Sequence, residues 1–315
     1  MRKLVALILA SIIIIPIQAS ASSEGLWDDA RILGGGGKLA GTIGTLPIDL
    51  TNNTTETSAS FGISDLPSIV EVYTATWCTN CITTEQALDE ALGDQEVTRI
   101  HYHRHLFEPT DPFGSNSTES RWIDSYGMGS IESSKTDFLD GQERVAPSKV
   151  FDGERMYTGI STKSNSLVTD YSTALVLGSS HPFYDNGSLA LSAERQGDSR
   201  EFSFSWDNVF SSSTENWEAN GWLMFVEKTA KFPEGSNGKE NYSHVLHEAV
   251  NIGPSQNGSI LMEPPRTWDG DDLTVVLVID WQTFGIENSL PAPAVSTLLC
   301  MLAAFAPRRQ HQHQD

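Results

Sequence analysis

The sequence predicts an α/β layered domain followed by an all-β antiparallel sandwich. Between residues 61 and 178, apolar strand-like segments alternate with helical ones, which is typical of α/β layers. Between residues 179 and 287, short β-rich segments recur at regular spacing, separated by Asn, Gly and Ser turns, and no long helical pattern interrupts them. We therefore place the boundary between the two predicted domains near residue 178.

The elements of the first domain follow from local patterns. Residues 68–76 alternate and are rich in Val, Ile and Tyr, which predicts a buried strand. Apolar residues at helical spacing predict a helix over 82–92. A second strand is expected over 97–105, and a helix opened by Ser, Thr and Glu119 over 117–126. The segment "RVAPSKVFDGERMYTG" predicts two paired strands joined at an Asp-Gly turn.

The second domain is predicted from five β-rich segments, "SLALSAERQ", "REFSFSWDNVF", "NGWLMFVEKTA", "YSHVLHEAVNIG" and "LTVVLVIDWQT". Trp206, Trp217, Trp222 and Trp281 lie in or beside these segments, and we interpret them as core residues.

The two ends carry the features of an exported protein. Arg2 and Lys3, an apolar run and the small residues Ala19-Ser20-Ala21 form the pattern of a signal peptide over 1–21. Residues 22–60 are rich in Gly, Thr, Asn and Ser, and we expect a flexible leader. Over 288–315, a proline motif precedes a short apolar stretch and terminal arginines. This tail resembles C-terminal sorting signals of the PGF-CTERM and PEP-CTERM kind, which implies attachment to a membrane at the cell surface.

Charge excludes one class of partner. Acidic side chains outnumber Lys and Arg by 41 to 20, for a formal net charge of -21. Nucleic-acid phosphates would be repelled, so we expect no nucleic-acid partner.

Two of the chain's three cysteines, Cys78 and Cys81, are separated by two residues at the predicted end of a strand and start of a helix. There, the helix dipole and unpaired backbone N–H groups lower a thiol pKa, which suits thiol–disulfide exchange. A zinc site would need two more soft ligands, and no second cysteine pair exists. A permanently closed structural disulfide is the other reading, because disulfides persist in exported proteins.

The segment "VEVYTATWCTNCITTEQALDEAL" resembles the active-site strand and helix of the thioredoxin superfamily. The resemblance implies an α/β thioredoxin-like domain, with Cys78 as nucleophile and Cys81 as resolving thiol. The histidine-containing strand, the "DPF" segment and the proline-led strand ending in "DG" are similar to a secreted thioredoxin-like group, and that likeness implies an all-β antiparallel sandwich after the domain. The resemblance to the superfamily also implies that Pro147, after a cis bond from Ala146, faces the pair and shapes the substrate site, with Trp77 beside it. The dipeptide Thr79-Asn80 departs from the dipeptides of that family, so the direction of catalysis stays open.

We therefore expect an exported thiol–disulfide oxidoreductase that acts on thiols and disulfides of other exported proteins, with no cofactor besides the Cys78–Cys81 disulfide. The alternative is a non-enzymatic surface or adhesion protein with a structural disulfide, binding through the sandwich. His101, His103 and His105 alternate, and three imidazoles on one strand face are able to bind a transition metal. Ordinary core or surface histidines are the simpler interpretation, and we predict no metal site.

Overall fold

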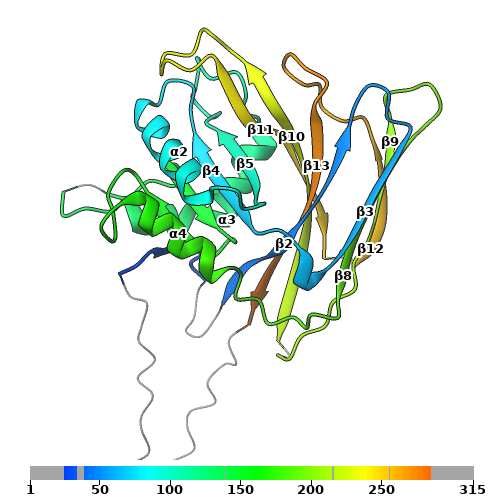
Figure 1. Ribbon diagram of the computed structural model, residues 1–315, viewed down its shortest axis with the longest axis horizontal. Coiled ribbons are helices and arrows are strands. Elements are labelled where there is room, and N and C mark those ends of the chain that lie inside the picture. Colours follow the sequence, from blue (N-terminus) through cyan, green and yellow to red (C-terminus); the bar gives the residue numbers. More distant parts are fainter. Residues whose placement is uncertain (1–24, 34–38, 139, 215, 255, 285–315) are drawn as a thin grey trace, which may run out of the picture.

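The computed structural model describes residues 25–33, 39–138, 140–214, 216–254 and 256–284. The described part of the chain is largely β, with 41% of its residues in strands and 19% in helices. Its strands form a nine-stranded mixed sheet and a four-stranded antiparallel sheet (Figure 1).

The nine-stranded sheet contains segments from almost the whole described chain. In spatial order its strands are β1 (Asp28–Asp29), β7 (Arg155–Thr158), β6 (Ser148–Phe151), β4 (Ile69–Thr74), β5 (Thr98–His103), β11 (Asn241–Gly253), β10 (Trp217–Lys231), β13 (Leu273–Thr283) and β2 (Ala40–Leu50). Strand β5 runs parallel to both neighbours, β4 and β11, and the other pairs are antiparallel.

Three α-helices of the described chain cover the β4 end of this sheet: α2 (Thr79–Leu92), α3 (Asn116–Ser134) and α4 (Leu167–Leu177). Because side chains alternate along a strand, Val70 and Val72 of β4 pack against α2 and α4, whereas Ile69 and Tyr73 pack against α3 on the opposite face. Helix α3 begins at a capping box in which Ser115 and Thr118 satisfy each other's backbone N–H groups.

The other half of the large sheet packs on the four-stranded sheet. In spatial order the small sheet contains β12 (Asn257–Met262), β9 (Phe202–Asp207), β8 (Ser188–Arg195) and β3 (Glu56–Gly62). A 3₁₀ turn, η1 (Ile63–Asp65), follows β3. The apolar core between the two sheets includes Leu46, Leu191, Phe204, Phe225 and Leu277, and all five are buried. Figure 1 shows the two sheets side by side, with the helices at the β4 end of the large sheet and away from the small sheet.

A largely buried ionic network joins the two halves. The Asp280 carboxylate of β13 accepts from Arg31 at 2.6 Å and lies 2.9 Å from Arg121 of α3. Arg121 also lies 3.6 Å from Glu71 of β4, which accepts from the Tyr102 hydroxyl at 2.5 Å. Although burial opposes its charge, Asp280 is held at a pKa below its ordinary value by Arg121 and Arg31.

The expected fold class is wrong, and with it the resemblance to the thioredoxin superfamily. The chain does not form an α/β thioredoxin-like domain followed by a separate sandwich, because β4 to β7 and the long strands β10, β11 and β13 belong to one sheet. The physical reason lies at β5, whose outer backbone groups need a partner. Strand β11 supplies it, with Val245 opposite His101. The predicted boundary near residue 178 falls between α4 and β8.

Most local elements are confirmed within a few residues, but the flexible leader over 22–60 is wrong. This segment contains β2 at the edge of the large sheet and most of β3 at the edge of the small one. Its content of glycine and threonine predicted flexibility, yet several of these residues are buried in close contacts between strands. A Cβ at Gly44 would lie 2.7 Å from the Leu66 Cβ, so only glycine fits there.

The predicted signal peptide over 1–21 and the sorting tail over 288–315 lie outside the described residues. Among the helices of the described part, none has the length and apolarity to cross a membrane.

The ionic network yields a stability prediction. Replacing Arg121 by Met leaves the carboxylates of Asp280 and Glu71 short of a counter-charge in the protein interior, and we expect a loss of about 3–5 kcal/mol in the free energy of unfolding. Urea denaturation measures it. As a control, Arg200→Met removes an ion pair with Glu263 in which both side chains are about half exposed, and should cost less than about 1 kcal/mol. Equal losses in the two variants would contradict the central place of the network.

Candidate functional site

Cys78 and Cys81 form a disulfide at the N-terminus of α2, with an S–S distance of 2.06 Å. Cys78 is the N-cap residue of the helix, and its Sγ accepts a hydrogen bond from the backbone N–H of Cys81 at 3.2 Å. Cys81 is fully buried, whereas Cys78 keeps 5% of its surface exposed. The first turn of α2 contains no acidic residue, so no carboxylate there opposes a negative charge on sulfur.

The loop before the disulfide is held by segments distant in sequence. The backbone N–H of Thr76 donates to the Asp111 carboxylate at 2.8 Å, and the Thr76 carbonyl accepts from Asn237 N at 3.1 Å and from the Tyr242 hydroxyl at 3.3 Å. Asn237 lies in the loop between β10 and β11, and Tyr242 in β11. The loop before the disulfide is therefore fixed by the strands of the predicted sandwich as well as by its own neighbours.

Asp111 is the buried acceptor at the centre of this loop's support. Besides Thr76 N, its carboxylate accepts from Phe113 N at 3.2 Å and lies 2.9 Å from His103 Nδ1. Both Asp111 and His103 are buried. The carboxylate thus fixes the turn before Cys78 to the end of β5.

The other side of the disulfide is formed by the predicted proline loop. Ala146 packs against the buried cluster of Ala75, Cys78 and Cys81, and the Ala146–Pro147 peptide bond is cis, which confirms that expectation. Directly after it, β6 begins and carries Lys149 next to Val72 of β4.

Trp77 lies at the surface beside Cys78 in sequence, and 37% of it is exposed. Its indole N–H donates to Glu108 Oε2 at 2.6 Å, which ties the ring to the loop after β5. In this loop Phe107 is 93% exposed and has a φ of 61°, a left-handed conformation that a bulky residue rarely adopts.

A buried lysine lies under the first turns of α2. The Lys149 Nζ donates to Thr84 Oγ1 at 2.7 Å, and this hydroxyl donates to the carbonyl of Cys81 at 2.9 Å. Both side chains are buried, and burial lowers the pKa of Lys149 to about 8.

The three alternating histidines do not form a metal site. His101 and His103 lie on the α2 face of β5 and are buried, whereas His105 follows the end of the strand. His101 contacts His244, with ring centroids 5.6 Å apart, and burial holds the pKa of His101 well below its ordinary value. Within the described ranges, no group of three or more His, Cys, Asp or Glu side chains is arranged to hold a metal ion.

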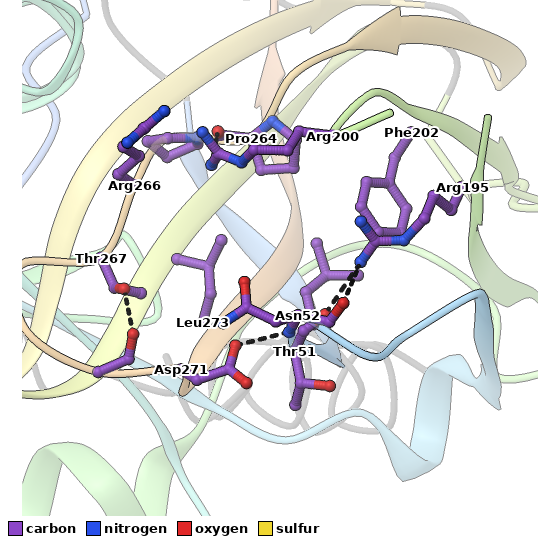
Figure 2. Close-up of a pocket in the computed structure, with 13 residues that line it drawn as sticks. Thr51, Asn52, Arg195, Arg200, Phe202, Pro264, Arg266, Thr267, Asp271 and Leu273 are labelled. Carbon is purple, nitrogen blue, oxygen red and sulfur yellow. Dashed lines mark hydrogen bonds between the residues drawn. The ribbon is translucent and has the colours of Figure 1, made fainter. Parts of the chain in front are cut away.

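A cavity of about 360 Å³ lies between the two sheets' ends, and neither cysteine is among its lining residues (Figure 2). Its apolar side includes the core residues Leu50, Phe202 and Leu273. Arg195, Arg200 and Arg266 also line it. The Arg195 guanidinium lies 4.6 Å from the Phe202 ring and donates to backbone carbonyls, including that of Asn52 at 2.9 Å.

Sequence reasoning found the cysteines and the Ala146–Pro147 loop, and the structure brings these together. It missed Asp111, Asn237, Tyr242 and Lys149. Asp111 stands in a "DPF" segment and Lys149 follows Pro147 by two residues, but nothing in their spacing from Cys78 indicates contact. The pairing of β5 with β4 and with β11, and of β4 with β6, brings these four residues to the site.

Comparisons with known proteins give little. No family model matches the sequence, and no curated protein matches it. Protein AGR_C_4864 of Agrobacterium tumefaciens is 15% identical, over 67% of this chain and 77% of that one, with a TM-score of 0.37. HBP35 of Porphyromonas gingivalis is 14% identical, over 67% and 68%, with a TM-score of 0.39. Likeness this weak carries no argument about function.

The support of the loop before Cys78 can be tested at Asp111. The change Asp111→Ala leaves the buried N–H groups of Thr76 and Phe113 without their acceptor, and we expect a loss of about 2–4 kcal/mol in the free energy of unfolding. Hydrogen exchange at the Thr76 amide should accelerate as well. The control is Glu108→Ala, because this partly exposed carboxylate accepts hydrogen bonds from Trp77 and Thr110 near the surface. If both variants lose the same stability, Asp111 is not the main support of the loop.

Proposed function

We propose that this protein exchanges thiols and disulfides through Cys78 and Cys81, as an exported oxidoreductase acting on thiols and disulfides of other exported proteins. The observation that carries the proposal is the position of the pair. Cys78 caps helix α2, and the N–H of Cys81 points at its sulfur. A thiolate at Cys78 would receive this hydrogen bond and the positive end of the helix dipole, and both lower a thiol pKa.

Unequal exposure assigns the roles of the two sulfurs. Cys78 retains exposed surface and Cys81 has none, so an incoming thiolate meets Cys78. Its attack forms a bond to the Cys78 sulfur and breaks the Cys78–Cys81 bond, and Cys81 leaves as a thiolate. The second thiol of the substrate, once deprotonated, attacks the substrate sulfur that is bonded to Cys78. This forms the substrate disulfide and releases Cys78 as a thiolate. The substrate dithiol has become a disulfide, and the protein disulfide a dithiol. The reverse sequence reduces a substrate.

Trp77, Ala146 and Pro147 are proposed as the substrate contacts. Ala146 packs on the cysteine cluster and Trp77 is exposed next to Cys78 in sequence, so both lie where a bound polypeptide would pass. Export and membrane attachment rest on residues 1–21 and 288–315 and stay proposals, as does the absence of a nucleic-acid partner.

The second candidate is a surface protein in which the disulfide is structural and the sandwich binds a ligand. The arginine-lined cavity of Figure 2 favours it, because three cations border a pocket of mixed polar and apolar lining in a strongly acidic protein. The reduction potential separates the two candidates.

We expect the Cys78–Cys81 pair to equilibrate rapidly with glutathione buffers, at a reduction potential of roughly -270 to -120 mV. The capping hydrogen bond stabilises the reduced form, which moves the potential into this range. Redox titration followed by thiol trapping measures it. A potential below about -300 mV with slow exchange would instead identify a structural disulfide and favour the second candidate.

The roles of the sulfurs are tested with single variants. The thiol of Cys78 in Cys81→Ser should react with iodoacetamide at pH 7 about tenfold faster than that of Cys81 in Cys78→Ser, as a pKa one unit lower implies. Peptide mass spectrometry distinguishes labelling at these two cysteines from labelling at Cys300, the third cysteine of the chain. Cys81→Ser should also accumulate mixed disulfides with a reduced protein that is being oxidised, and Cys78→Ser should not. Equal labelling rates would remove the assignment of Cys78 as nucleophile.

A further inference from the structure

Lys149 is buried under helix α2 and lacks an acidic partner. Its side chain is about 1% exposed, and its one hydrogen bond among the described residues goes to the Thr84 hydroxyl. The described part of the chain contains no ion pair between Lys149 and a carboxylate. An ammonium in this position costs stability, because burial removes its water and no counter-ion replaces it.

The surrounding acids are already paired. Glu85 of α2 accepts from Lys239 at 2.5 Å and from the Thr74 hydroxyl at 3.2 Å. Asp89, one turn further along α2, lies 2.5 Å from Arg99. The other charged or titratable groups that influence Lys149 are Lys239 in the β10–β11 loop and His101 on β5. His101 adds no compensating negative charge.

We infer that Lys149 is the buried counter-charge for the thiolate that forms when the Cys78–Cys81 disulfide opens, and that it sets the reduction potential of the pair. The inference rests on the exchange reaction proposed above. Lys149 reaches Cys81 through Thr84, in two hydrogen bonds that end at the Cys81 carbonyl. It does not contact the sulfur, so it is a positioning residue that acts through its charge.

The chemistry of the step explains why a cation belongs there. When a thiolate attacks Cys78, the electron pair of the broken S–S bond goes to Cys81. Cys81 is fully buried, so water does not solvate the new negative charge. A nearby ammonium stabilises that thiolate by attraction, or gives it a proton and becomes neutral. The lysine is thus unpaired in the oxidised protein and gains its partner on reduction.

Replacing the lysine separates this role from a structural one. In Lys149→Met the thiolate loses its counter-charge, so the disulfide should resist reduction. We expect the equilibrium constant with glutathione at pH 7 to shift about tenfold toward the oxidised protein, which corresponds to a potential about 30 mV more negative. Lys149→Arg keeps the charge and should keep most of the potential. Lys228→Met, at the exposed pair with Asp49, is the surface control and should change nothing.

The pH profile adds a readout that packing alone would not move. The pKa of Lys149 is about 8 in the oxidised protein, so its charge is present at pH 7 and is lost as the pH rises. The difference in potential between wild type and Lys149→Met should therefore be largest near neutral pH and narrow in alkaline buffer. A difference that is absent, or constant over this range, would overturn the inference.

Folding is checked on the same variants. Removing an unpaired buried charge should leave the oxidised protein at least as stable at pH 7 as the wild type, so a loss of stability in Lys149→Met would also count against the inference. Thr84→Val keeps the lysine and removes the bridging hydroxyl, and it should shift the potential in the same direction by less. A wild-type potential below about -300 mV that still falls further in Lys149→Met would refute the exchange enzyme but keep the counter-charge. If the wild-type potential lies in the exchange range and is unchanged in Lys149→Met, the exchange enzyme stands and the counter-charge role of Lys149 is refuted.

Discussion

The structure depends on the pairing of four charged groups in its interior. Arg31, Glu71, Arg121 and Asp280 come from the N-terminal segment, β4, α3 and β13, and each would be costly to bury alone. Their mutual contacts are possible only when the first and last strands of the described chain lie in one sheet with β4. The network therefore selects the long mixed sheet over any arrangement in which the two halves fold apart.

The same constraint explains how the disulfide is held. Because β11 pairs with β5, the loop between β10 and β11 reaches the backbone of Thr76, two residues before Cys78. Asp111 fixes the same residue from the end of β5. The loop before Cys78 thus takes its shape from the neighbouring Asp111 and also from a segment more than 150 residues away in the sequence. A β10–β11 loop of this kind is as much a part of the site as helix α2.

Local patterns predicted the local structure well. The alternation over 68–76 and the helical spacing after Cys81 identified β4 and α2, and the short proline-led segment identified β6 and β7. The errors came from long-range pairing and from composition. In the sequence alone, Gly44 suggests a flexible segment. In the structure, its lack of a side chain makes room for the side chain of Leu66. The sequence could not identify Lys149 as a site residue, because its position depends on its burial and on the register of β6 against β4.

The hydrogen bonds from Asn237 and Tyr242 to the Thr76 carbonyl have a consequence for modularity. The segment from β4 to α4 contains both cysteines and the proline loop, and it looks like a transplantable cassette. Without β10, β11 and β13, however, the edge of β5 would be exposed and Arg121 would lose its ion pair with Asp280. Evolution or an engineer could not graft this disulfide onto another scaffold as a unit. The Cys78–Cys81 disulfide and the long strands β10 and β11 therefore belong to one structural unit.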